Sequence, residues 1–502
     1  MPTNPASKVA TDPRLHRMLH APIVPTLLRM GWPNILMMLA QSSTGLIEMW
    51  FLARLGTDVL AGVAVVIPIL MLMQNMSQGA MGGGISAAVA RSMGARDAAL
   101  TASLARHAVV MCAALGLLFT VLLLAFGTPL YRLLGAHGPA LDAARSYGHV
   151  LFAGLVLMWV MNALASVVRG TGNMLVPGAV ICGGAVLLVP VSAVLILGAG
   201  PVPALGVVGG AWSLLVYYAG GAAVLGWYCA SGRCAARLSR GPVHWAPMRS
   251  ILTVGGLACI NPFLTNGLIA GTAAIVGAYA GTEALAGYAT AARLEYLLMP
   301  IAFGLGAPMV ALVGANIGAG QTKRAQRIAL AGGAIAFALA EVVGLAAALW
   351  PEAWLRLFGT DERLLQTGAH YLRIIGPFYG FFAMGFSLYF ASQGAGRLKW
   401  PLLASALRLF VYVALGGAVL ATTGSLTAFF AMGAAAMVLY GLGILWSVAG
   451  GSWFSSDTRR GVRPAAGPSG GTAGTRRETP SGRHEGPPAL ALAAAMPEDR
   501  KS

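Results

Sequence analysis

Charged residues are scarce in this sequence. They make up 10% of its 502 residues, and the 16 acidic residues are about half as numerous as the 33 basic ones. Soluble proteins carry about 25% charged residues, so this composition excludes an ordinary soluble domain. Hydrophobic residues reach 57% and the mean hydropathy is +0.74. Apolar runs of about 20 residues, long enough to cross a bilayer, recur along the chain. The sequence therefore predicts a polytopic membrane protein.

Motifs for catalysis and metal binding are also missing. The sequence has no nucleotide-binding P-loop, no His/Glu metal motif and no convincing nucleophile constellation. Its five cysteines lack metal-ligand spacing and are interpreted as small buried side chains. We therefore expect no enzyme, no metal site and no cofactor. The missing P-loop argues against transport driven by ATP, so we expect the energy to come from an ion gradient.

Apolar runs separated by polar or Gly/Pro-rich turns predict an all-α fold with twelve membrane helices. The predicted spans are residues 27–52, 59–88, 104–126, 146–168, 175–199, 206–230, 250–277, 285–313, 328–350, 369–391, 401–421 and 427–449. Residues 1–26 form an N-terminal segment. The tail at 455–502 is rich in Gly, Pro, Ser and Arg, and we expect it to be disordered.

Basic residues fall mainly in every second loop. Arg91 and Arg169 belong to this set, as does the basic loop at 231–249. An excess of Lys and Arg marks the cytoplasmic side of a membrane protein. We therefore expect a multi-pass protein of the cell membrane, inner or plasma, with both termini in the cytoplasm. Membrane topology thus accounts for the formal charge of +17. We therefore expect the lipid bilayer as a partner and no nucleic acid.

The two halves of the sequence match at a fixed offset. Tyr147 corresponds to Tyr371 at a shift of 224, and the early Gly56 corresponds to Gly281 at a shift of 225. The same register relates Gly94-Ala95 to Gly318-Ala319, and Gly170-x-Gly172 to Gly394-x-Gly396. The repeat unit is six helices, which predicts an N-lobe at 27–230, a linker at 231–249 and a C-lobe at 250–454. Parallel repeats of this kind place the substrate site between the lobes.

Several of these motifs resemble the multidrug and toxic compound extrusion (MATE) transporters. They are Pro33 with an acid fifteen residues later, the segment from Gly82-Gly83-Gly84 to Gly94-Ala95, the helix exit Arg169-Gly170-Thr171-Gly172-Asn173, and Val313-Gly314-Ala315-Asn316. The resemblance covers roughly residues 20–450. It implies two six-helix bundles in a V around a central cavity, and export of small organic cations. In most prokaryotic members the position of Glu48 is an aspartate implicated in binding the coupling ion.

Glu48 is the most informative residue, because it is a carboxylate inside an apolar span. A charge at the centre of a membrane helix costs roughly 2.5 to 3.5 kcal/mol on insertion, so such residues are functional by default. We interpret Glu48 as the ion-coupling residue. The alternative is that it reaches the outer interface near Arg54, or accepts hydrogen bonds as a packing residue. Pro33 removes a backbone hydrogen bond, which allows the first helix either to bend during transport or to carry a static kink.

Polar residues within the spans are candidates for the substrate cavity. In the first half they are Gln41, which is two turns from Glu48 on the same face, and Asn34, Gln74, Asn75, Gln78 and Asn162. Asn266, Tyr288, Glu295 and Tyr379 are the candidates in the second half. Each amide could instead make an interhelical hydrogen bond. For Glu295, a cavity role and a structural ion pair are equally compatible with the sequence, and snorkelling accounts for Arg408 near a helix end.

The favoured function is a secondary antiporter, acting as a monomer, that exports amphipathic organic cations in exchange for protons. Sodium is the alternative coupling ion, because a carboxylate with nearby amide oxygens also suits that cation. The alternative function is a flippase for a polyprenyl-linked saccharide or lipid precursor. Its cavity should present several Arg or Lys residues for pyrophosphate, and the predicted spans of the first half carry basic residues only near their starts, at Arg29 and Arg106.

Overall fold

The computed structural model describes residues 12–450 except 202, 239 and 240, and it is helical without a β-strand in that part of the chain. The first half contains α2 (Pro13–His20), α3 (Ile23–Leu52), η1 (Ala53–Leu55), α4 (Thr57–Gln74), the π-helix η2 (Asn75–Met81), α5 (Gly82–Gly94), α6 (Ala98–Leu133), α7 (Gly138–Ala153), α8 (Leu155–Gly170), α9 (Leu175–Leu197) and α10 (Val207–Ala230). The predicted tail at 455–502 lies outside the described residues.

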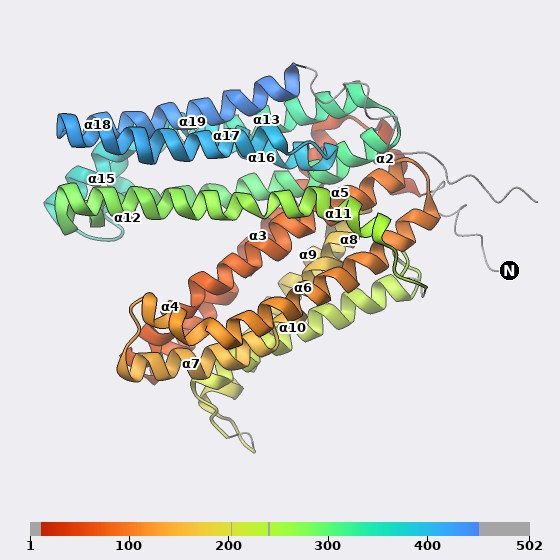
Figure 1. Cartoon of the computed structure of the whole chain (residues 1–502), viewed down its shortest axis with the longest axis horizontal. Coiled ribbons are helices and arrows are strands. Elements are labelled where there is room, and N and C mark those ends of the chain that lie inside the picture. The colour runs from red at the N-terminus through yellow and green to blue at the C-terminus, as the bar shows by residue number, and fades with distance from the viewer. Residues whose placement is uncertain (1–11, 202, 239–240, 451–502) are drawn as a thin grey trace, which may run out of the picture. The chain divides into compact units, whose positions relative to one another are not determined.

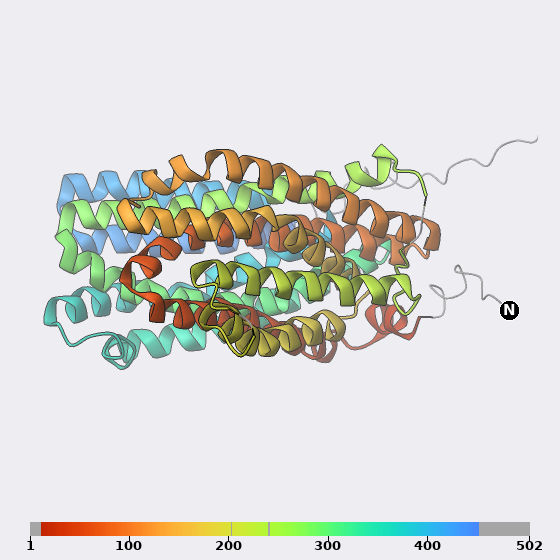
Figure 2. The ribbon, with the colours of Figure 1, turned by 90° about the horizontal axis from the view of Figure 1, so that it is seen from below.

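The second half follows the same plan. It contains α11 (Trp245–Ala258), α12 (Ile260–Gly318), α13 (Thr322–Leu349), α14 (Pro351–Leu355), α15 (Glu362–Ile375), η3 (Gly376–Phe378), α16 (Tyr379–Ala395), α17 (Lys399–Leu409), the π-helix η4 (Phe410–Leu415), α18 (Gly416–Thr423) and α19 (Leu426–Ala449). Figure 1 shows the long helices α12, α16, α17 and α19 of the second half running side by side, with α3, α6 and α10 of the first half at a slant to them, and Figure 2 shows the same helices from below. The all-α membrane fold predicted from the sequence is confirmed.

By length and composition, ten helical stretches of the described chain can cross a membrane, and the bent pair α7–α8, with 47° between its helices, makes an eleventh. One of the ten, Trp245–Gly318, has 74 residues. A continuous helix of that length would measure about 110 Å, against a hydrocarbon core of about 30 Å. Gly281 interrupts it with φ 82° and ψ 179°. Because only glycine adopts this conformation readily, Gly281 divides the stretch into two crossings.

The helices form two bundles that contact each other in a symmetric way (Figure 1). The first helix of each half packs on the second helix of the other half. A Cβ added to Gly31 in α3 would lie 3.2 Å from Leu305 in α12, and one added to Gly255 in α11 would lie 2.9 Å from Met81. These two pairs are related by the same shift of 224 residues. The internal repeat is therefore also a symmetry of the packing.

The backbones of the two bundles come close together where α5 crosses the end of α12, which we call the α5–α12 crossing. A Cβ on Gly94 would lie 2.0 Å from the carbonyl oxygen of Ala315, and a Cβ on Gly318 would lie 2.0 Å from that of Arg91. Only glycine permits such an approach of two backbones. The Arg91 guanidinium also donates a hydrogen bond of 3.0 Å from Nη1 to the carbonyl of Gly394.

The N-terminal segment contains a helix that the sequence analysis missed. Asp12 caps α2 by accepting a hydrogen bond from the backbone of Arg14 at 2.8 Å, and α2 buries Leu15, Met18 and Leu19. Asn316 of α12 donates to the carbonyl of Met18 at 3.1 Å. The Met18 side chain also packs against Gly172, which follows α8. This short helix therefore contacts both bundles.

Candidate functional site

Glu48 lies in the last two turns of α3 and is 4% exposed. Its side chain points into the first bundle, where Tyr147 of α7 donates a hydrogen bond of 2.6 Å from its hydroxyl to Oε1. A Cβ on Gly210 of α10 would lie 3.1 Å from the same oxygen, so the glycine leaves room for the carboxyl group. Three helices thus enclose Glu48.

This position excludes one of the alternatives for Glu48. The side chain does not reach the outer interface near Arg54, because the Arg54 guanidinium lies 3.9 Å above the Trp50 ring and Glu48 is buried. Because the side chain is buried among α3, α7 and α10, the carboxyl group does not face lipid. A carboxyl group in such surroundings has one polar partner and little solvent, which suits a group that binds and releases a proton as its surroundings change.

The second bundle contains a matching pair. The Tyr371 hydroxyl of α15 donates a hydrogen bond of 2.5 Å to Oε1 of Glu295 in α12. Tyr147 and Tyr371 are the tyrosines that the sequence repeat relates to each other. Neither alternative for Glu295 is found among the described residues: it does not line the cavity described below, and the two ion pairs are the exposed Arg356–Glu352 and Arg363–Glu283.

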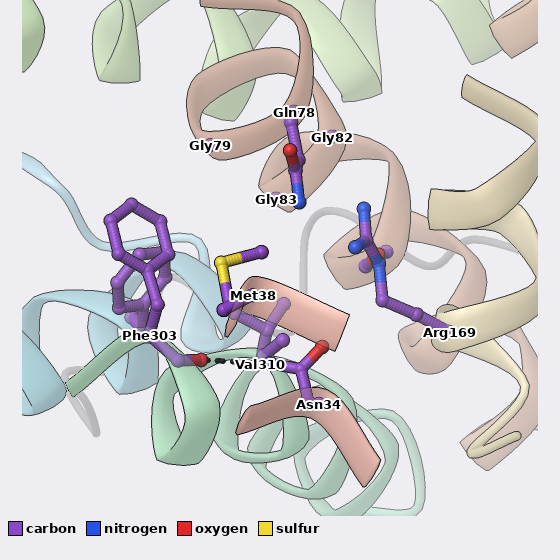
Figure 3. Close-up of a pocket in the computed structure, with 12 residues that line it drawn as sticks. Asn34, Met38, Gln78, Gly79, Gly82, Gly83, Arg169, Phe303 and Val310 are labelled. Atoms are coloured by element: carbon purple, nitrogen blue, oxygen red, sulfur yellow. Dashed lines mark hydrogen bonds between the residues drawn. The ribbon is translucent and has the colours of Figure 1, made fainter. Parts of the chain in front are cut away.

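A small cavity lies where the two bundles meet, just beyond the α5–α12 crossing (Figure 3). Its volume of about 30 Å³ has room for one or two water molecules. Residues from both bundles line it, namely Asn34 and Met38 of α3, Gln78 and Gly79 of η2, Gly82, Gly83 and Ser86 of α5, Arg169 of α8, Phe303, Ala307 and Val310 of α12, and Phe390 of α16.

The structure places two of the predicted cavity residues in this lining. Asn34 is buried and donates from Nδ2 to the carbonyl of Phe303 at 2.9 Å, which joins the two bundles (Figure 3). Gln78 points into the cavity from η2 (Figure 3), and its Nε2 atom is buried without an acceptor in the described part of the chain. A π-helix often marks a functional position, and η2 is the element that presents Gln78.

The other predicted amides of the first half lie outside the cavity lining. Asn162 is buried and donates to the hydroxyl of Ser77 at 2.7 Å, and Gln74 donates to Gln78 at 3.4 Å. The Asn162 contact, and a hydrogen bond of 3.5 Å that Gln74 accepts from the Tyr218 hydroxyl of α10, fit the alternative interpretation of interhelical hydrogen bonds. Asn75 is exposed, and Gln41 is half-buried and makes no hydrogen bond with Glu48 in the part of the chain that the structure describes.

The candidates of the second half also lie away from the cavity. Asn266 is exposed and donates to the carbonyl of Pro262 in its own helix at 2.8 Å. Tyr288 is buried in a bond of 2.8 Å with Thr272, and Tyr379 is fully buried. The second-half tyrosines therefore belong to the interior of their bundle.

Pro33 is buried inside α3, which continues through it from Ile23 to Leu52. Gly178 of α9 lies against this turn, because a Cβ there would be 3.3 Å from the Pro33 carbonyl oxygen. The missing N–H of Pro33 leaves the helix with one hydrogen bond fewer at the level of the cavity.

Two arginines of this region lie elsewhere than the sequence predicts. Arg91 and Arg169 are predicted in cytoplasmic loops, whereas they lie in α5 and α8, and Arg169 is only 4% exposed. The apolar run ends before each arginine, but the helix continues through the arginine and packs against other helices. Arg408 is likewise wrongly explained by snorkelling, because it is 8% exposed and its guanidinium lies 4.6 Å from the Phe382 ring centre.

Comparison with known proteins agrees with this fold. A family model described as MatE matches residues 33–194 and again residues 258–419, one match in each half. The chain belongs to the MatE family. Members of this family are transporters, not enzymes, so the chain is a multi-pass membrane transporter for small molecules. The second match begins 225 residues after the first, in agreement with the internal repeat.

Among curated relatives, this MatE protein is similar to an FAD transporter from Shewanella oneidensis, with 25% identity over 75% of this chain and 83% of the relative. It is also 25% identical to the probable multidrug resistance protein NorM from Thermotoga maritima, over 74% of this chain and 79% of the relative. Its fold matches a solved MOP superfamily transporter from Pyrococcus furiosus, with TM-score 0.78, 21% identity and coverage of 90% and 98%.

Proposed function

We propose that this MatE protein is a proton-coupled antiporter that exports amphipathic organic molecules, with Glu48 as the coupling residue. The observation that carries the proposal is the buried contact between Glu48 and the Tyr147 hydroxyl. An intramembrane carboxyl group without an ionic partner is costly to keep charged, so its retention favours a functional role. Proton binding at Glu48 changes the charge inside the first bundle.

The coupling that we propose is indirect. Glu48 does not belong to the lining of the cavity between the bundles, so proton and substrate do not compete for the same oxygen in this conformation. Proton binding and substrate binding can still shift the same equilibrium between two arrangements of the bundles. This shared equilibrium couples proton transport to substrate transport. α3 connects the two places, because it holds Glu48 in its last two turns and Asn34, in the cavity lining, about four turns earlier.

Protons are the proposed coupling ion, and sodium is the alternative. A sodium ion takes several oxygen ligands, in the way that hard cations bind carboxylates, amides and carbonyls. Among the described residues, the hydrogen-bond partner of Glu48 is the Tyr147 hydroxyl, which donates its hydrogen, and Gln41 makes no hydrogen bond with Glu48. This arrangement favours a proton over a metal ion.

Two substrate classes follow from the relatives. The resemblance to multidrug transporters, and the relative named as a probable multidrug resistance protein, favour organic cations as the exported class. The relative named as an FAD transporter favours a flavin nucleotide, which is an amphipathic anion. We propose organic cations first, with ethidium as the test substrate. The flippase alternative gains one argument, because Arg169 lies in the cavity, but one arginine falls short of a pyrophosphate site.

The test is efflux from vesicles that contain the purified protein, with an imposed pH or sodium gradient and ethidium as substrate. Wild-type protein should respond to the pH gradient, and Glu48→Gln should lose that response while it folds and binds ethidium. Asp58→Asn, which changes an exposed acid near the start of α4, is the control. Gradient-driven efflux that survives in Glu48→Gln contradicts the role of Glu48, and a response to sodium alone reassigns the ion.

A further inference from the structure

Arg169 is a buried cation at the cavity between the bundles. It lies on the last turn of α8 and is 4% exposed, with its side chain directed into the cavity (Figure 3). One nitrogen, Nη2, donates a hydrogen bond of 2.8 Å to the hydroxyl of Ser166 in the same helix. A guanidinium has five N–H donors, so a single neutral partner leaves most of them available.

No carboxylate neutralises Arg169 in the part of the chain that the structure describes. The lining of the cavity contains no acidic residue, and neither of the ion pairs between described residues involves Arg169. An unpaired buried charge is strongly destabilising unless a partner arrives. The end of a helix attracts a cation, which explains part of this placement. It does not explain why the side chain faces a cavity without a counter-charge.

Gln78 provides a second, independent observation. Its Nε2 atom faces the same cavity, is buried, and has no acceptor among the described residues (Figure 3). Buried donors are almost always satisfied, so an orphan donor indicates a missing acceptor. The Asn34 amide, in contrast, already donates to Phe303. The cavity thus presents a cation and an unused donor, and it lacks an acid.

Apart from Ser86, whose hydroxyl donates to the carbonyl of Ser166 at 2.7 Å, the rest of the lining is apolar. It includes Met38, Phe303 and Phe390, and the two phenylalanine rings lie 5.0 Å apart. Aromatic and thioether side chains suit a flat organic ring. The cavity volume of about 30 Å³ is too small for a whole substrate in this conformation. It can hold an anionic group while the remainder of the ligand follows the apolar wall into the space that opens when the bundles separate.

We propose that this cavity is a binding subsite for the phosphate or carboxylate group of an amphipathic organic anion. Arg169 supplies the charge and Gln78 supplies a second hydrogen bond. The proposal rests on the proposed transport function and names a substrate class for it, namely aromatic anions in addition to cations. Arginine is well suited to this role, because its planar fork binds two oxygens of one phosphate or carboxylate at once.

Two flavins test the proposal as a matched pair, because riboflavin and flavin mononucleotide share one ring and differ by a phosphate. Binding to the full-length protein in phosphatidylcholine nanodiscs can be followed by the flavin fluorescence. We expect the mononucleotide to bind about tenfold more tightly than riboflavin, as charge-assisted hydrogen bonds typically allow. Arg169→Gln should abolish that difference, and Arg169→Lys should restore part of it.

The control is Arg132→Gln, which removes an exposed arginine from the last turn of α6 and should leave the tenfold preference unchanged. Equal binding of the two flavins by wild-type protein, or a preference that persists in Arg169→Gln, overturns the proposal. A lipid headgroup could offer the same chemistry. If phosphatidylglycerol in the nanodiscs displaces the mononucleotide only when Arg169 is present, the site binds lipid and the proposed soluble substrate is wrong.

Thermal unfolding separates loss of binding from loss of folding. Arg169→Gln should unfold within a few degrees of wild type, and a variant that does not fold is replaced by Arg169→Met or Gln78→Leu, which should also reduce the preference. Ethidium efflux distinguishes this proposal from the transport proposal. If ethidium export depends on Glu48 while the flavins bind equally, only the anion subsite fails.

Discussion

Gly94→Ala is the sharpest test of the packing between the bundles. The new Cβ would lie 2.0 Å from the carbonyl oxygen of Ala315, 2.8 Å from its carbonyl carbon and 3.0 Å from its Cα. All three atoms belong to the backbone, so no side chain can rotate away. Ordinary contacts of this kind need at least about 3.5 Å, so α5 and α12 must separate by roughly 1.5 Å.

The cost of this separation can be estimated. Overpacking of a tight contact typically costs about 1–3 kcal/mol. The substitution acts on the arrangement in which the bundles touch and leaves an arrangement without this contact unaffected. A difference of that size between two states shifts their ratio by a factor of about 5 to 150. Gly94→Ala should therefore increase the fraction of molecules in which the α5–α12 crossing is open.

The assay is the rate at which a maleimide labels a cysteine in the crossing. Ala87→Cys is a suitable reporter, since Ala87 is fully buried in α5, and the native cysteines are removed first. We expect Gly94→Ala to raise the labelling rate at least fivefold. Gly183→Ala is the matched control, because a Cβ on this helical glycine meets nothing within 4 Å. Equal labelling of the two variants would refute the reasoning.

Three further predictions concern single contacts. Tyr147→Phe removes the donor to Glu48, and we expect pH-driven ethidium efflux to slow about tenfold or more, given the 1.5–3 kcal/mol typical of hydrogen bonds to charged groups. Asn34→Ala removes the bond to the Phe303 carbonyl and should speed amide hydrogen exchange in α3, whereas an unchanged rate would contradict its bridging role. Met18→Ser should make α2 more accessible to protease, since Met18 is buried there, and equal cleavage would show that α2 is not held by this contact.

Much of the fold could be predicted from the sequence, because a bilayer imposes a minimum length on each apolar helix. The predicted gap between residues 277 and 285 contains Gly281, which divides α12 into two crossings. The repeat also predicted a symmetry that the packing obeys. Gly94 and Gly318, which are equivalent in the repeat, approach the backbones of Ala315 and Arg91.

Other features were beyond the reach of hydropathy. The first half's second span was predicted to end at residue 88, but α5 continues to Gly94 because its last turn packs against protein. For the same reason hydropathy did not predict the burial of Arg169, which follows an apolar run but packs against protein. The amphipathic α2 was missed because it is only 8 residues long. The π-helix η2 has no sequence signature beyond the glycines that follow it.

The two tyrosine–carboxyl pairs show how the halves have become chemically different. Tyr147 and Tyr371 are equivalent in the repeat, but the acids are not, because the position 225 residues after Glu48 is Ala273 and Glu295 lies in a different helix of its unit. The tyrosine therefore marks a place in the bundle that receives a carboxyl group from whichever neighbouring helix supplies it. Glu48 approaches that place from α3, which also contacts the other bundle through Asn34. A change of charge at Glu48 can consequently act on the packing of the two bundles along one helix.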